Sequence, residues 1–380
     1  MPRQRFNDYY LVCDEDMADD TDSVEFRPPK RCSPKKIICV VSIVIVSLAL
    51  LAFFLIFVTF PLIFKYSVTL QQTLVFTRWN LMTNKTLFQR FRIPLYKNHY
   101  VPVKELDADK ILYLGLWHIL PFDLAETAYY DTSYDYDAAL QNTNYSVLLY
   151  FHGTGEDRSN SWQKYQLLRQ FFHVIAFDYR GYGDSDEGTM FERNVVNDCV
   201  QVYQWLRNRT NAAIYIWGHS LGTALATGTI AQLDNANITG FILESSFTTF
   251  RDELYYHPYV KYFRWLPWFE STVVNPLTEN GFIFNNTGNV LKTNVPFMFL
   301  HARDDEIVPY FMSRQLYNTS LTRNLDEKVL NASLLILYNE RIRLNHYFIY
   351  RDSYTYFYIY EFMRRCSEIS QMLFKSSHQS

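Results

Sequence analysis

The sequence predicts an α/β fold, with a mostly parallel sheet covered by helices on both faces, behind a single N-terminal transmembrane helix. Two observations support this prediction. From about residue 110 onward, short apolar runs alternate with segments of helical period. Before them, residues 37–64 form a run of 28 residues without a charge. The composition agrees, because 48% of the 380 residues are hydrophobic and 20% are charged, which excludes an intrinsically disordered chain.

Net charge and cysteine content exclude several functional classes. The 36 basic residues are balanced by 39 acidic ones, so the chain lacks the basic excess of a nucleic-acid-binding protein. Five cysteines are too few for a disulfide scaffold, and none form a C-x-x-C pair, which disfavours a structural zinc site. We therefore expect no nucleic-acid partner and no metal.

The uncharged run is expected to be a transmembrane signal-anchor helix. As a helix, its residues would extend about 42 Å, enough to cross roughly 30 Å of hydrocarbon with some tilt. Pro61 falls near its end, where a helix can stop. A cleaved signal peptide is the alternative, but the run is too long, begins too far along the chain and is not followed by a small-x-small cleavage site.

Flanking charges predict the orientation of this helix. Five basic residues lie in the fifteen positions before the run and two in the fifteen after it, which favours a cytosolic N-terminus. The rest of the chain is then lumenal or extracellular, and we expect the endoplasmic reticulum membrane. Seven N-x-S/T sequons all follow the run, as expected for a glycosylated lumenal domain. They begin at Asn84, Asn144, Asn208, Asn237, Asn285, Asn318 and Asn331.

We expect five segments along the chain. Residues 1–36 form a cytosolic disordered tail, acidic and then basic, and residues 37–64 form the anchor. Residues 65–109 are aromatic and basic without a clean period, which suggests a juxtamembrane segment near the bilayer surface. Residues 110–370 form the main domain, and residues 371–380 a polar tail.

The strands predicted in the main domain are mostly apolar on both faces, as in a sheet covered by helices. Between two of them, residues 191–207 place apolar side chains at helical spacing, with Cys199 on the buried face. The predicted strands are Ile111–Ile119, Ser146–Phe151, His173–Phe177, Ala213–Trp217, Gly240–Leu243, Val295–Leu300 and Leu334–Tyr338.

A candidate nucleophile lies in the pentapeptide Gly218-His219-Ser220-Leu221-Gly222. This G-x-S-x-G motif follows a predicted strand and opens an apolar helix at 221–233. In that context the serine stands on a sharp strand-to-helix turn, where small flanking residues let the backbone pack. The sequence therefore predicts that Ser220 is a nucleophile, which needs a histidine base and an acid to orient that base.

The acid and the base should follow the nucleophile in that order along the chain. The acid is expected just after the predicted strand at 295–300, where Asp304 and Asp305 compete. Asp305 is favoured because it precedes x-x-Val-Pro, and Asp304 is expected to bracket the loop. Only His346 and His378 follow these acids. His346 is the expected base, since it follows the last predicted strand, whereas His378 lies in the polar end of the chain.

An oxyanion hole requires two backbone N–H groups aimed at the developing charge. The amide of Leu221, directly after the nucleophile, is the first expected donor. The second is expected from the loop His152-Gly153-Thr154-Gly155 after an earlier strand, where we choose the amide of Thr154. His152 itself is expected to be structural.

Together these motifs resemble membrane-anchored α/β-hydrolase-domain proteins of the lysophosphatidylserine lipase and monoacylglycerol lipase kind. The resemblance covers about residues 110–365 and rests on FDYRGYGDS at 177–185, IWGHSLGT at 216–223, ILESSF at 242–247 and HARDD at 301–305. It implies an α/β-hydrolase fold, a lumenal catalytic domain and a triad of Ser220, Asp305 and His346. It also implies a serine hydrolase that acts on single-chain acyl lipids.

Two features bear on the substrate. The loop Gly153–Arg158 is more charged than the small-residue loop usual in the family. An insertion at about 248–294 is rich in tyrosine, tryptophan and phenylalanine, and an insertion here can cover the active site. Its aromatic residues suit either an apolar acyl tunnel or a contact with the membrane interface, although ordinary packing of a loop-rich segment is the alternative.

The function expected first is therefore a membrane-anchored serine esterase without a cofactor. Its substrates would be lysophospholipids such as lysophosphatidylserine, or monoacylglycerols, drawn from its own membrane. One alternative is an acyl-protein thioesterase, but such enzymes act on cytosolic cysteines and the flanking charges place this domain on the other side. The other is a catalytically silent binding ectodomain, which would usually have lost the nucleophile or the base.

Overall fold

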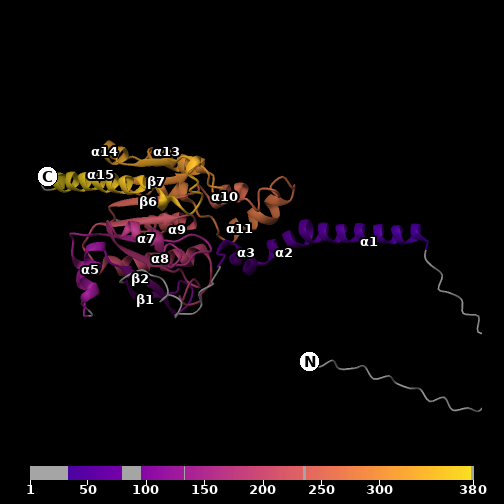
Figure 1. Ribbon diagram of the computed structural model, residues 1–380, viewed down its shortest axis with the longest axis horizontal. Coiled ribbons are helices and arrows are strands. Elements are labelled where there is room, and N and C mark those ends of the chain that lie inside the picture. Colours follow the sequence, from indigo (N-terminus) through magenta and orange to yellow (C-terminus); the bar gives the residue numbers. More distant parts are fainter. Residues whose placement is uncertain (1–32, 79–95, 132, 234–236, 378–380) are drawn as a thin grey trace, which may run out of the picture. The chain divides into compact units, whose positions relative to one another are not determined.

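The computed structural model describes residues 33–78, 96–131, 133–233 and 237–377 (Figure 1). Most of the expected cytosolic tail and the sequon at Asn84 lie outside these residues. The chain divides into two compact units, residues 1–56 and residues 57–380.

The uncharged run forms one helix, Pro34–Tyr66, which by length and composition can cross a membrane. No side chain of its first segment is buried by protein. Pro61 does not end the helix, although it has no N–H to bond the preceding turn. A π-helical turn lies directly before it, a form that often occurs as a single widened turn within an α-helix. The three segments are α1 (Pro34–Phe54), η1 (Leu55–Thr59) and α2 (Phe60–Tyr66).

The described strands of the second unit form one eight-stranded sheet in the order β1-β2-β4-β3-β5-β6-β7-β8. Pairing is parallel from β4 through β8, while β1 and β2 form an antiparallel pair and β2 also runs antiparallel to β4. This mostly parallel sheet confirms the predicted fold class. The strands are β1 (Tyr96–Lys104), β2 (Ile111–Ile119), β3 (Ser146–Phe151), β4 (Phe172–Phe177), β5 (Ile214–His219), β6 (Gly240–Glu244), β7 (Phe297–Ala302) and β8 (Leu334–Tyr338).

Strand β1 was not foreseen, because the stretch 65–109 has no clean period. In the structure β1 pairs with β2 along its whole length at the edge of the sheet. Only Val101 and Val103 of this strand are buried, while its other residues are wholly or partly exposed. An edge strand with so few buried positions leaves a weak period-2 signal, and polar and aromatic residues obscure it further.

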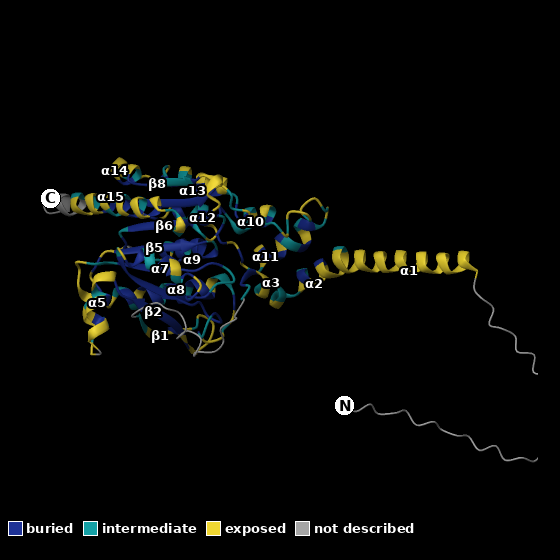
Figure 2. Ribbon diagram, viewed as in Figure 1, coloured by how far each residue is buried: buried dark blue, intermediate teal, exposed yellow. Residues whose placement is uncertain are grey.

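Most helices of the second unit pack on the two faces of the sheet (Figures 1 and 2). The last of them runs to Ser377, so most of the stretch expected as a polar tail is helical. The helices outside the segment between β6 and β7 are α3 (Val68–Val75), α5 (Phe122–Tyr130), α6 (Tyr136–Gln141), α7 (Trp162–Leu168), α8 (Glu192–Arg207), α9 (Leu221–Ala231), α13 (Tyr310–Ser320), α14 (Glu327–Asn331), α15 (Tyr354–Ser377), and the short 3-10 helices η3 (Glu340–Ile342) and η4 (Ile349–Arg351).

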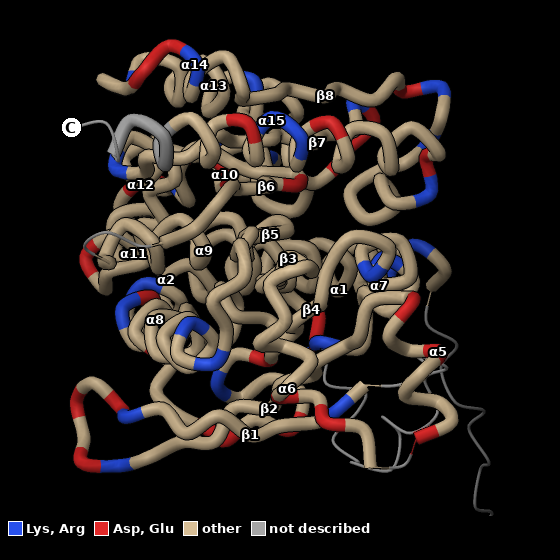
Figure 3. The backbone as a smooth tube through the Cα atoms, turned by 90° about the vertical axis from the view of Figure 1, so that its left-hand side faces the viewer, with Lys and Arg blue, Asp and Glu red and all other residues tan. Residues whose placement is uncertain are grey.

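Two core layers lie on opposite faces of the sheet. Leu149 of β3 packs in the layer that includes α8, α9 and α13, whereas its neighbour Leu148 packs in the layer with α7 and α15. Strands buried on both faces have no polar face, and the central strands β3 and β5 carry no charged residue (Figure 3). Cys199 and Cys366 lie in opposite layers as free thiols, so they do not pair.

The segment between β6 and β7 contains the insertion expected at about 248–294, and we refer to it as the cap. Its helices are short and are joined by turns and irregular backbone. They are α10 (Phe250–Tyr256), the π-helical η2 (Glu270–Val274), α11 (Asn275–Glu279) and α12 (Asn286–Val290).

Candidate active site

Ser220 stands at the turn between β5 and α9 in a strained conformation, with φ 52° and ψ −121°. The glycines on either side of it permit this turn. A Cβ on Gly218 would lie 2.6 Å from the carbonyl oxygen of Gly222, and a Cβ on Gly222 would lie 2.2 Å from that of Phe151. The backbone therefore packs too closely here for any side chain, which is the physical reason for the G-x-S-x-G pattern.

Asp305 and His346 lie in the loops after β7 and β8. Because the carboxyl ends of parallel strands share one edge of the sheet, these loops lie on the same edge as Ser220. The Nδ1 of His346 is 2.7 Å from the Oδ2 of Asp305, and both side chains are buried. The other oxygen of Asp305 accepts the amides of Ile307 and Val308, each at 2.9 Å. These contacts hold the carboxylate in a single orientation toward His346.

The environment of Asp305 keeps it ionised. Burial alone raises the pKa of this carboxyl, but the imidazoles of His346 and His301 beside it hold the pKa well below its usual range. An ionised carboxylate only accepts hydrogen bonds. Nδ1 of His346 therefore carries the proton and donates it to Asp305, which leaves Nε2 free to act as a base.

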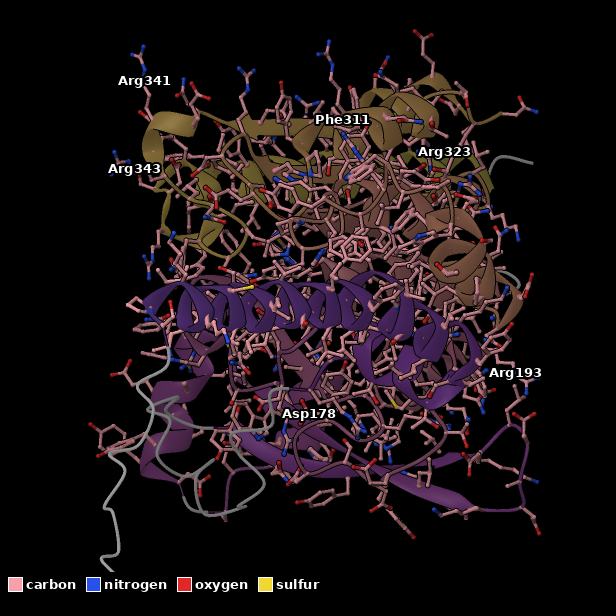
Figure 4. All side chains as sticks on the ribbon, turned by 90° about the vertical axis from the view of Figure 1, so that its right-hand side faces the viewer. Asp178, Arg193, Phe311, Arg323, Arg341 and Arg343 are labelled. Atoms are coloured by element: carbon pink, nitrogen blue, oxygen red, sulfur yellow. The ribbon has the colours of Figure 1, made fainter. Side chains whose placement is uncertain are left out.

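Asp304 brackets the loop, as expected. Its Oδ2 accepts the amide of Asn345, the residue before His346, at 3.0 Å. The segment before His346 directs Arg341 and Arg343 outward into solvent (Figure 4). These two arginines are therefore not part of the site.

The two expected oxyanion donors lie after β3 and β5. Thr154 follows β3 in the loop, and Leu221 is the first residue of α9. Within the described part of the protein, neither backbone amide donates a hydrogen bond to another protein group. The buried ring of His152 lies 4.1 Å from the ring of Tyr179, centroid to centroid.

Two residues of the site were not singled out as functional by the sequence. Oε2 of Glu156, in the charged loop, accepts the amide of Gly153 at 2.9 Å and lies 3.2 Å from Nδ1 of His219. The other ring nitrogen of His219 lies 3.0 Å from the carbonyl oxygen of His346, which Ser245 also contacts at 3.3 Å. Glu156 and His219 therefore join the loop of Thr154 to the backbone of His346. The only sequence feature that pointed to these residues was the unusual charge of the loop Gly153–Arg158.

Glu253 on α10 brings a second carboxyl to the site from the cap. Burial and the neighbouring negative charge of Asp305 raise its pKa to about 8, so it is protonated at neutral pH. Among the described residues, no group of three or more His, Cys, Asp or Glu side chains is arranged to hold a metal ion.

A cavity of about 320 Å³ lies beside Thr154, between the loop after β3 and the loop after β8. Most of its side chains are polar, including the buried Lys164, whose Nζ pairs with Glu244 at 2.6 Å. The other polar side chains around it include Glu156, Asn160, Ser161, Gln163, Tyr347 and Tyr350.

Comparison with known proteins identifies the family of this chain. A model of the hydrolase family described as serine aminopeptidase S33 matches residues 143–286. Lysophosphatidylserine lipase ABHD12 of Danio rerio is 30% identical over 314 residues, which cover 78% of this chain and 78% of that protein. This chain belongs to the ABHD12 family of α/β-hydrolases.

Other members of the ABHD12 family match over shorter stretches. The Xenopus tropicalis lipase is 34% identical over 65% of this chain and 64% of its own length, and the mouse lipase is 36% identical over 54% and 52%. The chain thus spans about half to two thirds of these curated relatives. Among solved structures, a Pyrococcus furiosus esterase matches with a TM-score of 0.48 at 17% identity, over 72% of this chain and 91% of that one.

Proposed function

We propose that this protein is a serine hydrolase that cleaves acyl esters of single-chain lipids, with Ser220, His346 and Asp305 as its catalytic residues. The observation that carries the proposal is the 2.7 Å contact between His346 Nδ1 and the ionised Asp305, at the same sheet edge as the strained Ser220. The family membership supports it, since relatives carry the name lysophosphatidylserine lipase.

The reaction follows from these roles. His346 Nε2 removes the proton from Ser220 Oγ as the oxygen attacks the ester carbonyl. The amides of Thr154 and Leu221 stabilise the resulting oxyanion. His346 then protonates the departing alcohol, which leaves an acyl-serine. A water molecule, deprotonated by His346, attacks the acyl-serine and releases the fatty acid, and the proton returns to Ser220.

The polar cavity beside Thr154 supports a substrate with a hydrophilic leaving group. Thr154 lines this cavity, so a substrate whose oxyanion is bound by that amide would have its ester close to the cavity. Hydroxyl, amide and charged side chains around it suit a glycerol or phosphodiester headgroup better than an acyl chain. Lysophospholipids such as lysophosphatidylserine and monoacylglycerols therefore remain the proposed substrates.

The test is fatty-acid release by membranes carrying the wild type or Ser220→Ala. The panel holds lysophosphatidylserine, other lysophospholipids, a monoacylglycerol and a palmitoyl thioester. We expect release from the single-chain esters that depends on Ser220, together with fluorophosphonate labelling of the wild type alone. Release only from the thioester would instead identify an acyl-protein thioesterase, and an unlabelled, folded wild type would identify a silent ectodomain.

We further propose that the N-terminus is cytosolic and the catalytic domain lumenal, in the endoplasmic reticulum membrane. The basic residues before the anchor support this orientation. The six sequon asparagines that the structure describes are all exposed, so glycans could be attached without unfolding the domain. Treatment with peptide N-glycosidase should increase gel mobility. Unchanged mobility in eukaryotic cells would contradict this orientation.

A further inference from the structure

The turns of the cap between α10 and η2 carry an exposed group of aromatic residues. Tyr259, Tyr262 and Trp265 are exposed by 80%, 68% and 72%. The exposed cations Lys261 and Arg264 lie between them in the chain. Tyrosine, tryptophan and basic side chains with long stems are the residues that proteins place at the membrane–water interface.

The same part of the cap contacts the end of the anchor helix. The ring of Phe263 lies 5.7 Å from the ring of Phe57, centroid to centroid. Phe57 precedes Lys65, the first charged residue after the apolar run, by eight positions, or roughly 12 Å of helix. If this helix crosses a bilayer with Lys65 among the lipid headgroups, then Phe57 and the adjacent Phe263 lie deeper than Lys65, and the neighbouring residues of the cap lie at the bilayer surface.

Buried hydrogen bonds and ring contacts hold the cap against the end of the anchor helix. The side-chain amide of Gln71, on α3, donates to the carbonyl oxygen of Phe64 at 2.9 Å, at the end of the anchor helix. Its oxygen accepts from Asn280, directly after α11 of the cap, at 2.7 Å. Next to it, the ring of Phe76 packs against Phe282 and Phe284. The position of the cap relative to residues 57–66 of the helix is therefore set by packing within the second unit.

The other end of this segment packs against α13, which follows the loop of Asp305. His257 at the end of α10 is partly buried, and its Nε2 lies 4.0 Å from the carboxylate of Glu253 on the same helix. The adjacent Tyr256 packs its ring against Phe311 of α13, at 5.1 Å. The residues from Tyr256 to Phe263 thus run from α13, the helix that follows the loop of Asp305, to the helix end that carries Phe57.

We propose that the cap segment His257–Trp268 is a membrane-contact surface that lies in the headgroup layer around the anchor and passes single-chain lipids from that leaflet to Ser220. The lipid-transfer part rests on the proposed function, whereas the membrane contact does not. The occupant of the surface is the bilayer itself, because the aromatic group is continuous with a helix end that lies in the same bilayer.

The contact can be tested directly with the full chain in phosphatidylcholine vesicles that contain a phosphatidylcholine with a diazirine in the upper acyl chain. After illumination, we expect lipid adducts on the tryptic peptides 252–261 and 265–292 of the cap. We expect few on the peptide that carries Tyr129 and Tyr130 of α5, which lies at the other end of the sheet (Figure 1). Cap peptides labelled no more than this control would overturn the proposal.

A second experiment tests the transfer of lipid. The variant Tyr262→Ser/Trp265→Ser should lose about 10-fold in kcat/KM toward lysophospholipid in vesicles, mainly through KM, because it removes two apolar surfaces from the interface. It should keep its rate on a soluble short-chain ester. The matched control, Tyr129→Ser/Tyr130→Ser, should change neither. Equal losses on both substrates, or no loss on vesicles, would contradict transfer through the cap.

The two experiments separate this inference from the proposed function. A wild type that is labelled in the cap but hydrolyses no lipid leaves the membrane contact standing and refutes the proposed reaction. A wild type that hydrolyses lysophospholipid but acquires no adducts in the cap refutes the membrane contact and leaves the reaction standing.

Discussion

His219 and Glu156 form a partly buried ion pair beside the candidate nucleophile, with Nδ1 of the imidazole 3.2 Å from the carboxylate. Nε2 of the same ring faces the carbonyl oxygen of His346 at 3.0 Å. Since both ring nitrogens face acceptors, both must carry protons, and His219 is an imidazolium. Burial lowers the pKa of His219, but the charge of Glu156 more than offsets this and raises it above its ordinary value.

We expect Glu156→Gln to lower kcat by about 10- to 100-fold with little change in KM. The substitution weakens the contacts through Glu156 and His219 that join the loop of Thr154 to the backbone of His346. The measurement is steady-state hydrolysis of a soluble ester. Glu126→Gln, which alters an exposed carboxylate on α5, is the matched control and should behave as the wild type. A KM effect alone would show that Glu156 contacts substrate and does not position His346.

The same pair predicts a dependence of stability on pH. Burial raises the pKa of Glu156, but His219, Lys164 and the amide of Gly153 hold it well below its usual range. The carboxylate therefore contributes stability above its unfolded pKa near 4.5, and His219 contributes below its unfolded pKa near 6.5.

The pair contributes its full stabilisation of the fold between the unfolded pKa values of Glu156 and His219. This stabilisation is lost as the pH rises through the raised pKa of folded His219. The other charged groups that act on this ring, Lys164 and Glu244, are held in their own salt bridge. The difference in Tm between wild type and Glu156→Gln should therefore be larger at pH 6 than at pH 9. A difference independent of pH would show that His219 is neutral.

Asp305→Asn should lower kcat by about 10³- to 10⁴-fold, because the amide no longer selects the Nδ1-protonated form of His346. Asp304→Asn is the matched comparison. It keeps an oxygen that can accept the amide of Asn345, so its loss should stay below about 10-fold. Equal losses in the two variants would mean that the acid has been assigned to the wrong aspartate.

Gly222→Ala should destabilise the fold by about 2 kcal/mol or more and abolish activity, since the new methyl group would collide with the carbonyl of Phe151. Gly228→Ala, on the same helix, meets no atom closer than 3.5 Å and should gain about 0.5–1 kcal/mol. Chemical denaturation of both variants in detergent micelles provides the test. A well-folded, active Gly222→Ala enzyme would show that the turn can relax.

The stability of Glu253→Gln relative to the wild type should increase as the pH rises from about 5 to 8. The pKa of Glu253 rises from 4.5 to about 8 on folding, so the wild type loses stability across this range and the glutamine variant does not. The measurement is Tm at pH 5 and pH 8. Glu279→Gln, at an exposed position of the cap, should shift Tm equally at both. A Glu253→Gln shift that does not grow with pH would mean that Glu253 is charged in the folded protein.

The sequence by itself determined the features that depend on neighbours in the chain. The uncharged run predicted a helix long enough to cross a membrane, and the short apolar strands predicted the mostly parallel sheet, because runs without a polar face indicate burial on both sides. The serine turn was predictable because its two glycines answer a local steric requirement. The order of Ser220, Asp305 and His346 followed from the topology of such sheets.

Only the tertiary structure decided which distant groups meet. Glu156 and His219 are 63 residues apart and become partners only because β3 and β5 are adjacent. Phe57 and Phe263 touch because the cap folds back onto the end of the anchor. Edge strand β1 was missed because few of its side chains are buried. Local patterns encode burial and backbone conformation, whereas ion pairs and ring contacts across the fold depend on the packing of whole layers.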